Sequence, residues 1–221
     1  MKGVVYIKLL FLENFNKIAV DDSFLNRLSD NRRRRYDLYL NSFEKKRFLV
    51  SEMLIMNCLK DSFSIEEPSI ISQPYNKPLI KNGNKIDFNK SYCDSSVCIA
   101  ISDKAKIGID CERIQPKDEN IMRYFFTPHE INYVENSPNK NLAFTLIWTR
   151  KESFIKCISS GLNFKLFELD TAPTLKMQNG EKLFSANDAV NGHFINSYLI
   201  DELLISVCAS IDDSFPEFQR R

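Results

Sequence analysis

Three carboxylates and two lysines, gathered in two short segments, are the residues of this chain best suited to chemistry. Residues 107–112 read Ile-Gly-Ile-Asp-Cys-Glu, and residues 148–156 read Trp-Thr-Arg-Lys-Glu-Ser-Phe-Ile-Lys. Magnesium prefers oxygen ligands and usually takes a few carboxylates together with substrate phosphates, while lysine is suited to the phosphate charge. The two segments therefore predict a site for magnesium and a pyrophosphate.

The first segment predicts a β-strand over 107–112. Side chains alternate along a strand, so Asp110 and Glu112 share one face. Two carboxylates in this position repel each other unless a cation or a basic group lies near them. The alternative is that both are charges on the solvated face of an edge strand.

The second segment predicts a long helix over about 139–158 that ends before Gly161, a natural C-terminal cap. Its apolar stripe contains a lysine, Lys151; the other members are Phe144, Ile147, Phe154 and Ile158. A buried lysine needs a charge partner, so Lys151 pairs inside the fold, extends to its edge, or faces a bound anion. Glu152 and Lys156 are four residues apart, which also fits an ordinary surface ion pair.

The remaining pattern predicts the elements that position these segments. They are a first strand within 1–15, two helical pieces within 24–60, a loop-rich connector over 68–84, a strand at 97–101, a polar break at 116–120, a helix that begins at Thr127 and a strand pair at 193–200 and 203–210. Asn41 with Glu44, and Thr127 with Glu130, have the spacing of a capping box. Segments 97–103 and 207–213 resemble each other weakly. We therefore predict an α+β fold of two similar α/β halves related by a pseudo-twofold axis, residues 1–106 and 107–221.

Composition indicates an ordinary globular protein. Of 221 residues, 43% are hydrophobic and 27% are charged, and the formal net charge is +1, which gives no global reason to expect a nucleic acid or a membrane as partner. The start lacks a cleavage pattern, and no apolar stretch approaches membrane-spanning length. Six cysteines without a CxxC pair, and only two histidines, make zinc unexpected and fit a reducing cytosol. We predict a soluble cytoplasmic protein.

The run Arg32 to Arg35 is the clearest local concentration of positive charge. Arg32 and Arg35 are one helical turn apart and together could clamp a phosphate. The alternative is a solvated helix face.

Four stretches together resemble the 4′-phosphopantetheinyl transferases of the large, surfactin-synthetase-activating type. They are Tyr-Asn-Lys-Pro at 75–78, Phe-Asn-Lys-Ser at 88–91, Gly-Ile-Asp-Cys-Glu at 108–112, and residues 148–156 with the Gly-Leu at 161–162. Their order, spacing and total length agree with the family, and the resemblance covers essentially the whole chain. It implies transfer of the phosphopantetheine arm of coenzyme A to a serine of an acyl- or peptidyl-carrier protein, with release of adenosine 3′,5′-bisphosphate.

The resemblance also implies roles for single residues. Asp110, Glu112 and Glu152 would bind magnesium, and Lys156 would face the pyrophosphate, so the catalytic set is Glu152, Lys156 and Asp110. The base that takes the serine proton is Glu152, a water of the metal shell, or Glu130. The predicted contacts with coenzyme A, mostly in the N-terminal half, are Arg32, Arg35, Arg47, Lys77, Pro78, Ser91, Tyr92, Lys151 and Lys156.

Tyr92 departs from the family, which usually has histidine directly after the serine. Tyrosine can donate one hydrogen bond but carries no positive charge at neutral pH. This change predicts weaker binding of coenzyme A or a shifted pose, and it leaves open a binding protein that has lost catalysis. Two other classes are weaker. A nucleic-acid-binding module would use Arg32 to Arg35 despite the neutral net charge, and a magnesium-dependent nucleotide hydrolase would lack a P-loop.

A carrier protein is the expected macromolecular partner, with no nucleic acid and no membrane. Its acidic helix is expected to dock on segment 113–126, where Arg123 precedes the aromatic run 124–126. The same aromatics could instead belong to the core. The family type implies a monomer.

Overall fold

The computed structural model describes residues 7–73, 76–81, 83, 85–159, 165–173, 188–210 and 219–220, which form two compact units. The first unit contains the described chain up to Lys90, Asp94–Ala105 and the last strand. The second contains Ser91–Cys93 and the chain from Lys106 onward to that strand. Each unit packs helices on a largely antiparallel sheet, so the predicted α+β class is confirmed. The division after Ala105 lies next to the predicted boundary. Two short segments depart from it, because Ser91–Cys93 belong to the second unit and the last strand belongs to the first.

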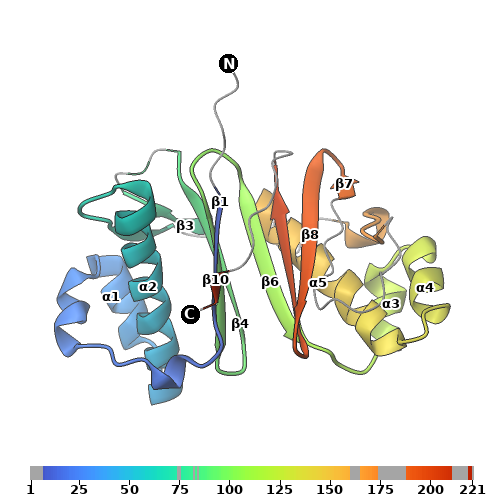
Figure 1. Ribbon diagram of the computed structural model, residues 1–221, viewed down its shortest axis with the longest axis horizontal. Helices are drawn as coiled ribbons and strands as arrows, with labels where there is room; N and C mark the ends of the chain where they lie inside the picture. The colour runs from blue at the N-terminus through green and yellow to red at the C-terminus, as the bar shows by residue number, and fades with distance from the viewer. Residues whose placement is uncertain are drawn as a thin grey trace. The chain divides into compact units, whose positions relative to one another are not determined.

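In the first unit, a four-stranded sheet is covered by helix α2, with α1 further out (Figure 1). Its elements are β1 (Ile7–Leu12), 3-10 turns at Phe15–Lys17 and Asp22–Arg27, α1 (Asp30–Asp37), α2 (Ser42–Phe63), β2 (Ile70–Gln73), β3 (Asn76–Ile80), β4 (Asp87–Cys93), β5 (Ser96–Ser102) and β10 (Gln219–Arg220). The strand order is β10-β1-β5-β4. Asn41 caps α2 by accepting a hydrogen bond from the Glu44 N–H, as its spacing predicted.

The predicted loop-rich connector at 68–84 is wrong for 70–73 and 76–80, because β2 and β3 form an antiparallel hairpin there. Pro78 lies in β3 and lacks the N–H that a central strand must donate. A sheet of only two strands leaves each strand one outer edge, where proline is tolerated. The proline that suggested a loop therefore marks an edge strand.

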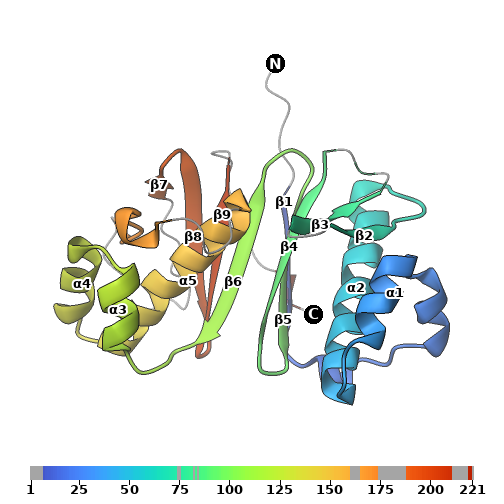
Figure 2. The same ribbon diagram turned by 180° about the vertical axis from the view of Figure 1, so that it is seen from behind.

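In the second unit, α5 lies along one face of a four-stranded sheet, with α3 and α4 on the other side of the helix (Figure 2). Its elements are β6 (Ile107–Arg113), α3 (Glu119–Phe125), α4 (Pro128–Glu135), α5 (Lys140–Ile158), a 3-10 turn at Leu166–Glu168, β7 (Asp188–Val190), β8 (His193–Ile200) and β9 (Leu203–Ala209). The strand order is β6-β9-β8-β7. The predicted strand at 107–112, helix at 139–158 and strand pair are confirmed. The predicted polar break at 116–120 is wrong in its second part, because Asp118 caps α3.

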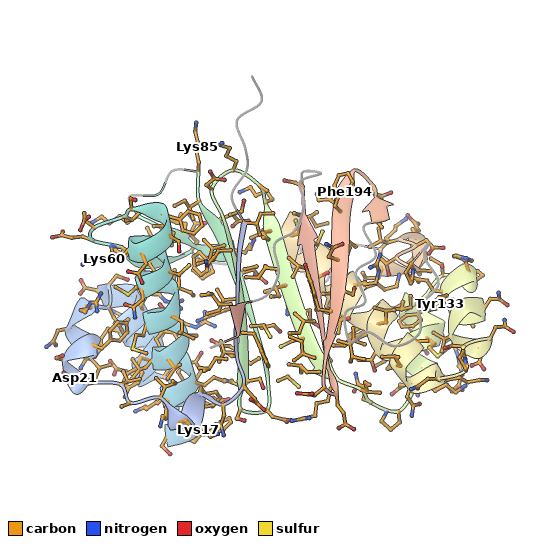
Figure 3. The ribbon with its side chains drawn as sticks, in the orientation of Figure 1. Lys17, Asp21, Lys60, Lys85, Tyr133 and Phe194 are labelled. Atoms are coloured by element: carbon orange, nitrogen blue, oxygen red, sulfur yellow. The ribbon has the colours of Figure 1, made fainter. Side chains whose placement is uncertain are left out.

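The apolar stripe of α5 is buried except for Ile158, which is half-buried. Phe144 and Ile147 pack toward α3 and α4, and Phe154 packs with residues of β8 and β9. Figure 3 shows the side chains that fill this unit, with Tyr133 on α4 and Phe194 on β8 labelled. The helix ends at Ile158 and is capped by Ser159, whose φ of 56° is left-handed; the predicted cap, Gly161, lies outside the described residues. No helix in the described ranges is long and apolar enough to cross a membrane.

Gly108 lets β6 and α5 come unusually close. A Cβ added there would lie 2.0 Å from the Ser153 carbonyl oxygen and 2.4 Å from the Cys157 nitrogen, both backbone atoms of α5. Asp110 and Glu112 follow Gly108 on the same strand face. The missing side chain therefore places the carboxylates of β6 directly beside the helix that carries Glu152 and Lys156.

Replacing Gly108 with alanine is expected to destabilise the protein by about 1–3 kcal/mol or more, because the helix backbone must move to admit the methyl group. Transfer activity should fall further than stability alone explains, since the movement separates Asp110 from α5. Urea unfolding and initial rates would measure both effects. Gly83→Ala is the control, because its Cβ would meet side-chain atoms rather than backbone, those of Ile80 at 2.9 Å and Ile65 at 3.5 Å. Equal effects of the two variants would contradict this account.

Candidate active site

Asp110, Lys156 and Ser91 form a compact polar cluster in the second unit. Lys156 Nζ donates to Asp110 Oδ1 at 2.6 Å, and Ser91 Oγ donates to the same oxygen at 2.9 Å. Lys156 Nζ is also 3.3 Å from Ser91 Oγ. Lys156 therefore pairs with the carboxylate of β6 rather than forming a simple surface pair with Glu152. Three of the predicted site residues lie together.

The other oxygen of Asp110 is left without a partner. Asp110 is only 4% exposed, and no donor among the described residues reaches the buried Oδ2. A buried polar atom without a hydrogen bond is costly and commonly marks a place where water or an ion belongs.

Glu152 lies close enough to Asp110 for their charges to interact. Burial raises the pKa of Glu152 first, the Asp110 charge raises it further, and Lys156 opposes both. Mutual repulsion of two carboxylates is what a bound cation relieves. Glu112 is half-buried on the same face of β6.

The three predicted magnesium ligands do not form a ready-made metal cluster. In the part of the chain that the structure describes, no three histidine, cysteine, aspartate or glutamate side chains gather closely enough to hold a metal. Two observations nevertheless fit a divalent cation, namely the orphaned Asp110 Oδ2 and the repulsion felt by Glu152. The donors are all carboxylate oxygens, the type that magnesium prefers.

Lys151, a predicted contact of coenzyme A, lies inside the fold and is bonded there. Its side chain is fully buried, and Nζ donates to Glu130 Oε2 at 2.8 Å, to the Leu166 carbonyl at 2.8 Å and to the Leu169 carbonyl. All three ammonium hydrogens are used inside the fold. Burial lowers the pKa of Lys151, and the Glu130 charge partly offsets this. Of the alternatives left by the sequence, pairing inside the fold is the one observed.

Glu130 is the structural partner of Lys151 and is poorly placed to act as a base. It is fully buried. Its Oε2 also accepts from the Thr127 N–H, and its Oε1 accepts from the N–H and the hydroxyl of Thr171, each at 2.8 Å. Arg150 Nε donates to the Thr171 carbonyl at 2.5 Å. These bonds tie the segment 165–173 to α4 and α5.

Arg32, a predicted phosphate contact, is likewise buried and paired inside the fold. Arg32 is 1% exposed, and two of its nitrogens bind the carboxylate of Glu52, Nε at 2.9 Å. A third donates to Ser72 Oγ at 3.1 Å. Lys90 Nζ reaches the same carboxylate at 2.9 Å. Burial by itself would raise the pKa of Glu52, but Lys90 and Arg32 outweigh it and lower the pKa.

The other predicted contacts with coenzyme A occupy accessible or half-buried positions. Arg35 is exposed on α1, and Tyr92 is half-buried on β4. Arg47 pairs with Glu44 at 3.2 Å, and Lys77 pairs with Asp87 at 2.7 Å; these residues, together with Pro78 in β3, stay predictions. In segment 113–126 the aromatic run divides: Tyr124 is 63% exposed and Phe126 is buried.

Arg32 and Arg35 give a paired prediction. Arg32→Ala leaves Lys90 as the one cation that contacts Glu52 among the described residues, and it should cost up to about 3–5 kcal/mol, the range for a broken buried ion pair. Arg35→Ala should change stability by no more than about 0.5 kcal/mol but raise the dissociation constant for coenzyme A. Urea unfolding and calorimetric titration separate the two roles. If Arg32→Ala weakened coenzyme A binding without loss of stability, Arg32 would be a ligand contact after all.

A comparison with known proteins identifies the family of the region that contains Asp110, Glu152 and Lys156. The family model described as the 4′-phosphopantetheinyl transferase superfamily matches residues 106–208, which include β6 and α5. The transferase gsp of Aneurinibacillus migulanus is 32% identical over 164 residues, covering 71% of this chain and 67% of that protein. The chain belongs to the 4′-phosphopantetheinyl transferase superfamily. The predicted family is thereby confirmed.

Two further relatives align with the present chain over nearly its whole length. The Bacillus subtilis protein named 4′-phosphopantetheinyl transferase is 28% identical, with 87% of each chain covered. The transferase Sfp of Bacillus subtilis strain 168 is 26% identical, covering 89% of this chain and 88% of Sfp. Similarity over this length supports the large, surfactin-synthetase-activating type.

Proposed function

We propose that this chain transfers the 4′-phosphopantetheine arm of coenzyme A to a serine of an acyl- or peptidyl-carrier protein, as a holo-[acyl-carrier-protein] synthase type of enzyme. The observation that carries the proposal is the cluster of Asp110, Lys156 and Glu152 where β6 meets α5. These residues come from the two segments that resemble the family most specifically, and both lie inside the region that the family model matches.

Phosphoryl transfer needs positioning and charge neutralisation more than covalent help from the protein. The carrier serine attacks the β-phosphorus of coenzyme A, and adenosine 3′,5′-bisphosphate leaves. Lys156, already held by Asp110, supplies positive charge to the pyrophosphate. Asp110, Glu112 and Glu152 would hold magnesium, which when bound polarises the phosphate oxygens. Glu152 is the favoured base, since its raised pKa makes it a better proton acceptor than an ordinary glutamate.

The binding roles of the remaining residues follow from the family resemblance. Arg35, Arg47, Lys77 and Pro78 are proposed contacts of coenzyme A. The carrier protein would dock near Arg123 and Tyr124 of α3, both exposed, because carriers present an acidic helix and basic and aromatic side chains suit it.

The proposal also covers the oligomeric state, the symmetry of the fold and the cellular compartment. A monomer of two similar halves related by a pseudo-twofold axis is expected for the large type. None of the six cysteines is in a disulfide bond, which fits a cytoplasmic, reducing compartment.

Tyr92 favours one alternative, a divergent homologue that binds coenzyme A or a carrier with weak or absent catalysis. Chromatographic detection of adenosine 3′,5′-bisphosphate distinguishes the two. The proposed enzyme releases it from coenzyme A only when an apo carrier protein and magnesium are both present. Binding of coenzyme A without release, across acyl- and peptidyl-carriers, would support the alternative and contradict the transferase.

A further inference from the structure

We infer that Ser91 is a positioning residue for Asp110: its hydroxyl holds one carboxylate oxygen, so that the other is presented to a divalent cation. The inference rests on the proposed function, in which Asp110 binds magnesium. It assigns Ser91 a role different from the phosphate contact that the family resemblance implied.

The hydrogen-bonding capacity of a serine hydroxyl carries the first step. A hydroxyl has one hydrogen, and Ser91 Oγ donates it to Asp110 Oδ1 at 2.9 Å. The oxygen of the same hydroxyl accepts from Lys156 Nζ at 3.3 Å. Ser91 is only 7% exposed. To donate to a phosphate, Ser91 would have to release Asp110, so its principal partner is the carboxylate.

The second step concerns how the two oxygens of Asp110 are divided. Oδ1 receives both Ser91 Oγ and Lys156 Nζ, the latter at 2.6 Å, and two donors on one oxygen fix the rotation of the carboxylate. Oδ2 is buried and meets no donor among the described residues. Outer hydrogen-bond partners of metal-binding carboxylates orient the ligand in this way, and their loss commonly weakens metal binding.

The third step concerns the charge around Oδ2. Lys156 is committed to Oδ1, and no donor among the described residues reaches the buried Oδ2 to offset its negative charge. A divalent cation at Oδ2 satisfies the orphaned oxygen, because carboxylate oxygens are the ligands that magnesium prefers. Without the Ser91 bond the carboxylate could rotate and give both oxygens to Lys156, which would remove the atom that a cation needs.

Binding of Mn²⁺, followed by electron paramagnetic resonance on the full chain with and without saturating coenzyme A, tests the inference. Ser91→Ala should weaken Mn²⁺ binding roughly 10–100-fold, while the affinity for coenzyme A measured in EDTA stays near that of the wild type. Ser91→Thr keeps the hydroxyl and should stay within a few-fold. Ser96→Ala is the matched control, since it removes an equally buried strand hydroxyl that donates to the Glu13 carbonyl.

The outcomes separate the inference from the function on which it rests. If Ser91→Ala kept wild-type Mn²⁺ affinity but bound coenzyme A more weakly, Ser91 would be a phosphate contact and the inference would be overturned, with the transferase intact. If the wild type bound no Mn²⁺ with or without coenzyme A, the metal role itself would fall. Should Ser91→Ala not fold, Ser91→Cys decides, because its weaker donor should give an intermediate loss, and wild-type affinity there would also overturn the inference.

Discussion

Replacing Glu152 with glutamine is expected to lower the rate of phosphopantetheine transfer by a factor of about 10²–10⁴, the range for loss of a general base. The amide keeps the size of the side chain but can neither accept the serine proton nor offer a charged oxygen to magnesium. The effect should lie mainly in kcat, because Glu152 acts on the reacting groups rather than on the remote parts of coenzyme A. Initial rates with an apo carrier protein measure it.

The folded state should tolerate this change well. Burial raises the pKa of Glu152, and the Asp110 charge raises it further, so a neutral amide removes a repulsion and the melting temperature should not fall. Glu168→Gln is the control, because Glu168 lies on the surface in a pair with Lys165. A Glu152→Gln variant that is folded and as fast as Glu168→Gln would show that Glu152 is neither base nor metal ligand.

Replacing Lys151 with methionine is expected to destabilise the protein by about 3–5 kcal/mol, because it leaves Glu130 as an unpaired buried charge. For a chain of this size the melting temperature should fall by roughly 6–20 °C. The variant also frees the carbonyls of Leu166 and Leu169 from their ammonium donor. Calorimetry or thermal circular dichroism measures the shift.

A double variant tests whether the unpaired charge is the cause. Adding Glu130→Gln to Lys151→Met removes that charge, so the double variant should be more stable than Lys151→Met alone. Lys165→Met is the control. It breaks the exposed ion pair between Lys165 and Glu168 and should change stability by at most about 1 kcal/mol. If Lys151→Met were no worse than Lys165→Met, the buried pair would not hold the fold as described.

The sequence predicted well where local periodicity and motif agree. Period-two alternation placed Asp110 and Glu112 on one strand face, and the structure shows that this face meets α5. Helical spacing placed Lys151 inside the apolar stripe, which is where its buried side chain lies. The resemblance supplied the family. Gly108 was visible as part of a motif, but its purpose is the backbone contact with α5, which only the packed structure reveals.

The sequence failed where a partner lies far along the chain. A run of four arginines does not say which one turns inward, because that depends on Glu52, twenty residues away. Likewise, the sequence showed only the capping-box spacing of Glu130, although its carboxylate also holds Lys151 and Thr171. Positive charge in a motif therefore predicted phosphate binding at Arg32 and Lys151, where tertiary contacts use the charge internally.

Intact-mass spectrometry of an apo peptidyl-carrier protein, incubated with this chain, coenzyme A and magnesium, tests the central claim most directly. The account predicts a mass gain of one phosphopantetheine arm that requires magnesium, is lost when the acceptor serine is replaced with alanine, and is greatly slowed in Glu152→Gln. No gain with any of several acyl- and peptidyl-carriers, while coenzyme A still binds, would contradict it.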